Sequence, residues 1–142
     1  MWSALRARCA GHVRGCFGSP QIIGKIVRPV ATNDIVMSTS TDGTSWTSPV
    51  RIPIDAVDST VDHFIPGIAV DRDSSGSTAR LALTYYYYSN AKCTQSTCQL
   101  SVGFVSSVDG GATWSAPQTL AGPMKLTDLA NTNSGFMVGD YL

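Results

Sequence analysis

Two copies of a short turn motif constrain the fold of this chain more than any other feature. Residues 107–114 read S-x-D-G-G-x-T-W, and residues 40–46 read S-T-D-G-T-S-W, with one residue fewer between aspartate and tryptophan. We call residues 40–46 the first box and residues 107–114 the second box. Both tryptophans begin a shared W-x-x-P sequence. Internal repetition of this kind indicates a protein built from repeated supersecondary units.

The residue types of the boxes predict tight hairpin turns. Aspartate can bond the backbone two residues on, which starts a turn, and glycine supplies positive φ at little steric cost. Tryptophan offers a large apolar plate that covers the hairpin. We therefore assign a structural and not a catalytic role to Ser40, Asp42, Gly43, Trp46, Ser107, Asp109, Gly111, Thr113 and Trp114.

The sequences around the boxes predict antiparallel strands and no long helix. Leu81, Leu83, Tyr85 and Tyr87 alternate with Ala82, Thr84, Tyr86 and Tyr88, so both faces of that strand are apolar or aromatic and we expect it between two layers. Prolines 49 and 53 place their strand at a sheet edge. At most one helical turn is expected, near residues 124–130. Strands are expected at 34–40, 47–54, 64–71, 79–88, 99–107, 113–120 and from about 135, with 64–120 forming one four-stranded sheet.

Composition indicates a globular chain with an uneven charge distribution. Hydrophobic residues make up 43% and charged residues 14%, and all ten acidic residues are aspartates. Residues 1–30 carry five basic groups and no acid, whereas residues 31–142 have a net charge of about −5. The acidic body gives no indication of nucleic-acid binding, and no apolar run is long enough to span a membrane. Residues 1–28 resemble nothing downstream and are left as an unassigned basic segment, with the repeat region at 29–142.

Two of the four cysteines lie close together in a polar loop. Cys93 and Cys98 flank T-Q-S-T between two predicted strands, a spacing that favours a disulfide and a secreted protein. The alternative is two free thiols. A zinc site is not expected, because no second cysteine or histidine pair lies at ligand spacing.

From about residue 30 onward the chain resembles the sialidase and BNR-repeat superfamily. The boxes carry the resemblance, together with H-F-I-P-G at 63–67, the four tyrosines at 85–88 and M-V-G-D-Y at 137–141. It implies an all-β, partial six-bladed β-propeller with about two blades in this chain, and a longer parent protein. It also implies that the boxes lie on the rim, away from an active site near the axis that uses three arginines, a Tyr–Glu pair and an aspartate.

This resemblance suggests a fragment of a secreted exo-α-sialidase-type glycoside hydrolase that removes terminal sugars from glycans. The alternatives are a non-catalytic propeller that binds carbohydrate or protein, and a purely structural repeat. The chain contains no glutamate, so a Tyr–Glu pair cannot be complete here. The chain alone is therefore expected to be inactive. We expect a glycan partner, no cofactor, no metal, no nucleic acid and no membrane contact.

A few polar residues fall where the resemblance puts the axial mouth of a propeller. Asp62 lies just before one predicted innermost strand, and Asp140 and Tyr141 lie within the next, so these three are the catalytic candidates and His63 a substrate-binding candidate. The alternative is hydrogen bonding between neighbouring blades.

Three further groups have residue types that suit a functional role. Arg51-Ile52-Pro53 spells a sialidase arginine motif, but it follows a box instead of preceding one, so we give it no role. The tyrosines at 85–88 are expected to be core rather than a sugar platform. Calcium binding by Asp55, Asp58 and Asp62 is a further alternative, although their spacing matches no EF-hand loop.

Overall fold

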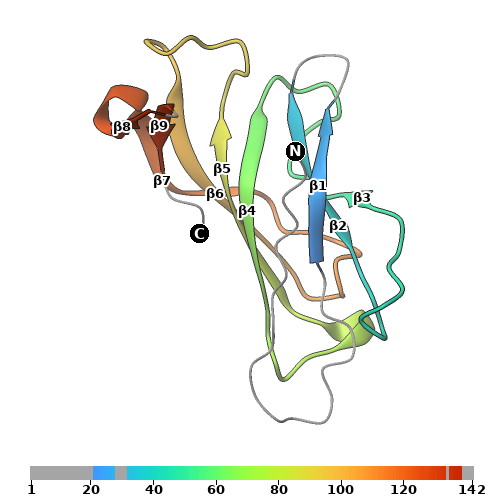
Figure 1. Ribbon diagram of the computed structural model, residues 1–142. Coiled ribbons are helices and arrows are strands. Elements are labelled where there is room, and N and C mark those ends of the chain that lie inside the picture. Colours follow the sequence, from blue (N-terminus) through green and yellow to red (C-terminus); the bar gives the residue numbers. More distant parts are fainter. Residues whose placement is uncertain (1–20, 28–31, 134, 139–142) are drawn as a thin grey trace.

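The computed structural model describes residues 21–27, 32–133 and 135–138, with the backbone alone along 21–27. These residues form three antiparallel sheets, and their only helices are two short 3-10 turns at Gly76–Thr78 and Leu126–Asp128 (Figure 1). The predicted all-β class is therefore confirmed. No closed ring of sheets is present among the described residues. In this part of the chain no helix is long and apolar enough to cross a bilayer.

The largest sheet is a four-stranded meander in which each strand pairs with the next along the chain. Its order is β4 (Asp62–Val70), β5 (Leu81–Tyr88), β6 (Gln99–Ser107) and β7 (Gln118–Lys125). The four-stranded sheet predicted for 64–120 is thus present. β7 begins five residues after the predicted 113, because the second box holds residues up to Trp114 in the turn and Pro117 has no N–H for the ladder.

A second sheet has the order β1 (Gln21–Val27), β2 (Asn33–Ser38) and β3 (Val50–Arg51). The prolines correctly placed β3 at an edge, but β3 has only two residues where eight were predicted. β1 was not predicted, since residues 1–28 were left unassigned. A third sheet pairs β8 (Ala130–Thr132) with β9 (Gly135–Met137), so the strand expected from about 135 has a partner directly before it.

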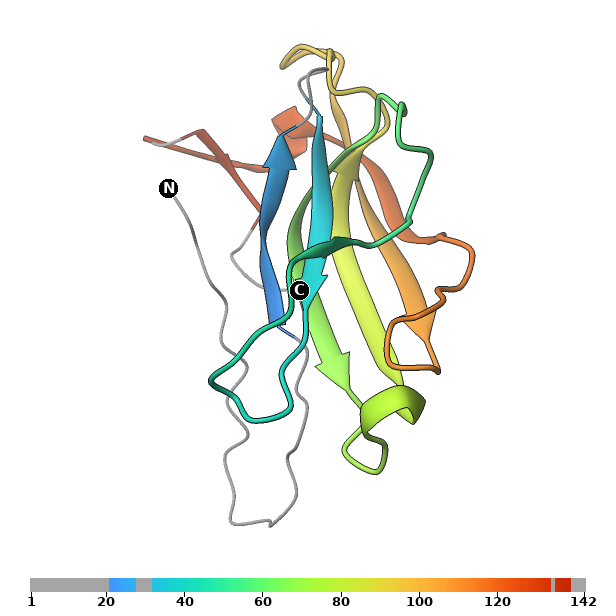
Figure 2. The same cartoon turned by 90° about the vertical axis from the view of Figure 1, so that its right-hand side faces the viewer.

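The core lies between the first two sheets. Figure 2 shows β1 and β2 in front of the meander. Buried side chains of both sheets pack together between them. Burial of these apolar side chains is the main favourable term for joining the sheets. Leu81, Leu83 and Tyr85, which share one face of β5, belong to this core. The buried cluster comprises Ile35, Met37, Ile52, Ile54, Ala79, Leu81, Leu83, Tyr85 and Val105.

The other face of β5 meets different neighbours. Tyr86 is 7% exposed, stacks near Phe64, and donates its phenolic hydrogen to the Val138 carbonyl at 3.1 Å. The tyrosines at 85–88 therefore pack on both faces of the sheet, in agreement with a strand between layers.

A bulge in β4 decides which of its side chains face the core. The pairing slips between Phe64 and Gly67, and Ile65 has φ 44°, a strained value for a β-branched residue. Ile68 packs against the core. Without the extra residue, strict alternation would place His63 on the opposite face from Ile68. With it, His63 also faces the sheet junction.

Candidate functional site

The second box is closed by its own side chains. Ser107 Oγ donates to Asp109 Oδ1 at 2.7 Å and accepts the Gly111 N–H at 2.9 Å. The Thr113 N–H donates to Asp109 Oδ1 at 2.8 Å, and the Thr113 hydroxyl donates to the other carboxylate oxygen. The Trp114 indole N–H reaches the Gly111 carbonyl at 3.1 Å. These bonds hold the pKa of Asp109 at about 2, below its ordinary 3.8, the Thr113 hydroxyl being the largest cause.

The first box repeats part of this network in the shorter loop. Ser40 Oγ donates to Asp42 Oδ1 at 3.0 Å and accepts the Gly43 N–H at 2.8 Å. Asp42 Oδ1 accepts the Ser45 and Thr44 N–H groups, each at 2.7 Å, and these bonds lower the pKa of Asp42.

The residues that flank the boxes match as well. Thr47 N–H donates to the Thr39 carbonyl at 2.9 Å, and Ser115 N–H donates to the Ser106 carbonyl at 2.8 Å. The hydroxyls of Thr47 and Ser115 accept the N–H of Thr39 and Ser106, both at 3.0 Å. Both boxes therefore occupy equivalent turns between successive antiparallel strands, as predicted.

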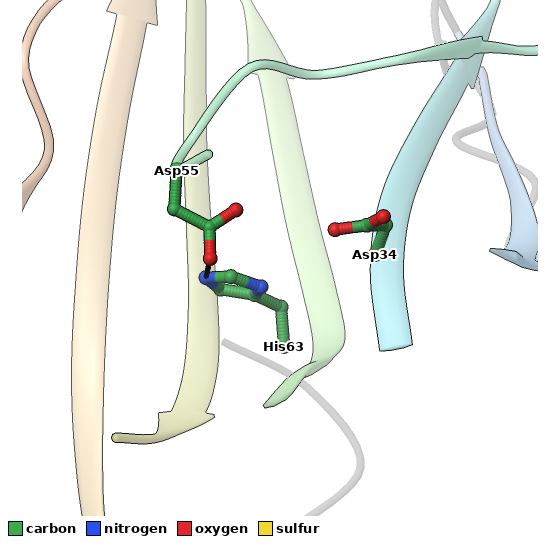
Figure 3. Close-up of side chains that lie close together, drawn as sticks. All are labelled: Asp34, Asp55 and His63. Carbon is green, nitrogen blue, oxygen red and sulfur yellow. Dashed lines mark ion pairs between the residues drawn. The ribbon is translucent and has the colours of Figure 1, made fainter. Parts of the chain in front are cut away.

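The candidate functional site is a cluster of ionisable side chains at the junction of the two larger sheets. Asp34 comes from β2, Asp55 from the segment after β3, and His63 from β4 (Figure 3). Arg51 of β3 joins them. One ligand atom from each of Asp34, Asp55 and His63 lies within 4.8 Å of the other two. Arg51 was not expected to belong to any site.

Arg51 holds the two carboxylates together. Its Nε lies 3.1 Å from Asp34 Oδ2 and forms an ion pair with it, but the geometry of this contact is not that of a hydrogen bond. Its two terminal nitrogens donate to the backbone carbonyl of Asp55, at 2.9 Å, and to Asp55 Oδ1. The other oxygen of Asp55 accepts from Ser59. The Arg51 and Asp55 side chains are 19% exposed and Asp34 is 6% exposed, so solvent screens these pairs weakly.

His63 lies between the two carboxylates and is 3% exposed. Its Nε2 is 3.9 Å from Asp55 Oδ2, and its second nitrogen is turned toward the side of Asp34 (Figure 3). That nitrogen, Nδ1, has no hydrogen-bond partner among the described residues. Burial lowers the pKa of His63 from its ordinary 6.5, against the opposing pull of Asp55, the Asn33 carbonyl and Asp34, while Arg51 lowers it further. The imidazole is therefore neutral at pH 7.

Aromatic rings close the junction on the side of β5. The ring of Tyr85 meets His63 edge-on at a centroid distance of 5.4 Å, and that of Tyr87 lies at 6.4 Å. Burial raises the pKa of Tyr85 to about 12, with smaller contributions from Tyr87 and Asp55. This phenol therefore remains protonated at neutral pH and offers no nucleophile.

The charge arrangement favours an ion-pair junction over a metal centre. Two carboxylates and an imidazole are ligands that divalent cations accept, but the guanidinium of Arg51 already bridges both carboxylates. The guanidinium therefore already neutralises the carboxylates, which is what a bound metal cation would do. The three aspartates considered for calcium, Asp55, Asp58 and Asp62, are not gathered into one site. Only Asp55 belongs to the cluster, and Asp58 is exposed.

The structure places some of the predicted site residues and not others. Asp62 accepts the Asn33 N–H at 2.7 Å through Oδ1, a contact that joins the ends of β4 and β2. This is the hydrogen bonding between neighbouring units that was the alternative to catalysis. His63 is buried beside it. Asp140 and Tyr141 lie outside the described residues. A disulfide joins Cys93 and Cys98, with their Cα atoms 4.9 Å apart.

Comparisons with protein-family models, with curated proteins and with solved structures found no match for this chain.

Proposed function

We propose that this chain is part of a sialidase-like six-bladed β-propeller, in a secreted protein that acts on glycans, and that the described residues serve it as scaffold. The observation that carries the proposal is the hydrogen-bond network of the two boxes. In each box the serine hydroxyl donates to the aspartate and accepts a glycine N–H, although the loops differ in length. In this proposal the four-stranded meander is one blade and the sheet β1–β3 belongs to its neighbour.

For the whole protein we propose exo-α-sialidase-type hydrolysis of terminal sugars, because the box pattern and the surrounding motifs resemble that family. This chain would supply structure rather than chemistry. It has no glutamate for a Tyr–Glu pair, and the arginine of its R-I-P sequence, Arg51, is engaged with two aspartates.

A non-catalytic propeller that binds carbohydrate is the second candidate, and one observation favours it. Asp62 and His63, the described residues nearest to a proposed axial mouth, are occupied by contacts between sheets. A carboxylate fixed to a backbone N–H and a buried imidazole are poorly placed to reach a sugar.

The test compares the 142-residue chain with the longer parent protein that this proposal requires, called the long product below. Both are assayed with a fluorogenic sialoside and for binding to immobilised glycans. We expect no turnover from the short chain and turnover from the long product. Glycan binding without turnover by the long product would favour the second candidate. Absence of both would contradict the proposal.

A variant of the long product then tests the scaffold role. Asp62→Asn keeps the shape of the side chain, and its amide oxygen can still accept the Asn33 N–H. We expect kcat and KM to remain within about twofold, since the carboxylate contacts backbone and not substrate. A large fall in kcat with unchanged stability would make Asp62 a catalytic residue and overturn this part of the proposal.

A further inference from the structure

His63 occupies a position that couples the two larger sheets. It projects from β4 toward Asp55 in the segment after β3, and one ring nitrogen is on the side of Asp34 in β2, the middle strand of the sheet next to the first box. The neighbouring bond from Asn33 N–H to Asp62 crosses the same junction at 2.7 Å. A change in the charge of this imidazole therefore acts directly on the contact between the sheets.

Among the described ionisable side chains of the junction, His63 is of the one residue type whose charge ordinarily changes near neutral pH. The ordinary pKa values of aspartate, arginine and tyrosine side chains lie outside the range from about pH 5 to 8. Histidine alone has an ordinary pKa within that range. The groups that act on it are Asp34 and the Asn33 carbonyl of β2, Arg51 of β3, Asp55 after β3, and Tyr85 and Tyr87 of β5.

The geometry suits a neutral imidazole better than a charged one. Nδ1 makes no hydrogen bond among the described residues, and the Asn33 carbonyl and Asp34 favour a proton on the ring less than burial disfavours it. Asp55 already accepts from Arg51 and Ser59, and its oxygen lies 3.9 Å from Nε2, beyond hydrogen-bond distance. A positive charge on the ring would also face the guanidinium of Arg51, which contacts the same two aspartates.

We propose that His63 is a proton-sensitive latch, which holds the sheet of the first box against the meander at neutral pH and loosens this junction as the surroundings become acidic. The latch follows from the buried position of the ring at the junction and does not depend on the proposed function.

The direction of the effect follows from proton binding. Because the folded chain holds His63 below its ordinary pKa, the unfolded chain binds its proton first as the pH falls. Stability is therefore full above about pH 6.5, decreases below that value, and levels off once the folded form is also protonated. Each unit between the folded and unfolded pKa values lowers the folding equilibrium constant about tenfold.

The experiment compares urea unfolding at pH 7.5 and pH 5.5 for three proteins. They are the unaltered chain, His63→Gln, and the control His12→Gln, which removes the other histidine of the sequence. We expect the unaltered chain and the control to lose stability by the same factor on acidification, and His63→Gln to lose much less. Equal pH dependence in all three proteins would overturn the latch.

A second measurement on the unaltered chain covers the case in which His63→Gln does not fold. The ring protons of His63 are titrated by NMR, and hydrogen exchange of the Asn33 amide is followed at both pH values. We expect a midpoint below about 6.5. We also expect Asn33 to lose protection at pH 5.5, relative to amides shared by β5 and β6. A midpoint at or above the ordinary value, or unchanged protection of Asn33, would overturn the proposal.

Discussion

The two box hairpins share a turn but differ in how the returning strand is held. Around the second box, β6 and β7 remain paired over most of their length. Around the first box, β3 pairs with β2 at two positions, Val36↔Arg51 and Met37↔Val50. The chain then leaves the ladder, although the Ile52 N–H still reaches the Ile35 carbonyl at 2.9 Å.

Contacts outside the ladder compensate for the short strand. Ile52 and Ile54 are 2% and 7% exposed and belong to the core, and Arg51 joins Asp34 to Asp55. The comparison shows that a box fixes a turn but not the length of the strands around it. One hairpin relies on backbone pairing, and the other relies on buried apolar side chains and an ion-pair cluster.

Breaking the cluster should have the largest effect. In Arg51→Met, two carboxylates that are 6% and 19% exposed would lose their shared cation. Removing one partner of a buried ion pair costs about 3–5 kcal/mol, and we expect about 3 kcal/mol for this partly exposed group. Urea unfolding followed by tryptophan fluorescence measures the loss.

The matched control is Arg80→Met. Arg80 pairs with Asp71 at 2.6 Å, but its side chain is 58% exposed, so we expect a loss of only about 0–1 kcal/mol. Similar losses in the two variants would show that the cluster does not compensate for the short β3.

The glycines of the two boxes provide a second, smaller contrast. Gly43 has φ 74° and open space where a Cβ would stand, whereas a Cβ on Gly110, at φ 71°, would lie 2.6 Å from the backbone oxygen of Gly76. Gly43→Ala should cost about 1 kcal/mol from the left-handed backbone alone. Gly110→Ala should cost more than about 2 kcal/mol, because backbone must also move. Equal thermal stability of the two variants would contradict this contrast.

Strands with clear alternation and a box at one end were predictable from the sequence. The predicted 99–107 coincides with β6, and the alternating Leu81, Leu83 and Tyr85 of β5 share the core face. The length of β3 was not predictable, because Ile52 and Ile54 read as a continuing strand while their burial comes from tertiary packing. β1 carries no box and lies in a segment whose composition differs from the rest.

The ionic cluster could not be assembled from sequence for a different reason. Strict alternation places His63 on the face of β4 opposite to Ile68, and the bulge at Ile65 reverses this. Pro66 was the available signal, since proline within a strand often marks a bulge. Even with that signal, contacts such as Arg51 to Asp34 join residues from separate elements, which local patterns do not reveal.

The smallest expected effect concerns acid titration of the box carboxylates. The Thr113 hydroxyl is the largest of the causes that hold the pKa of Asp109 at about 2, and Asp109 loses these bonds on unfolding. The unfolded chain therefore binds this proton first, so the stabilising contribution of Asp109 is full above its ordinary 3.8 and is lost as the pH falls toward 2. In Thr113→Val we expect the titration midpoint of Asp109, followed by carboxyl NMR, to rise toward 3.8.

The midpoint of Asp42 serves as the internal control, because its lowered pKa depends on the Ser45 and Thr44 backbone and should not move. An unchanged Asp109 midpoint would mean that the backbone of the second box, like that of the first, is sufficient to hold its carboxylate ionised.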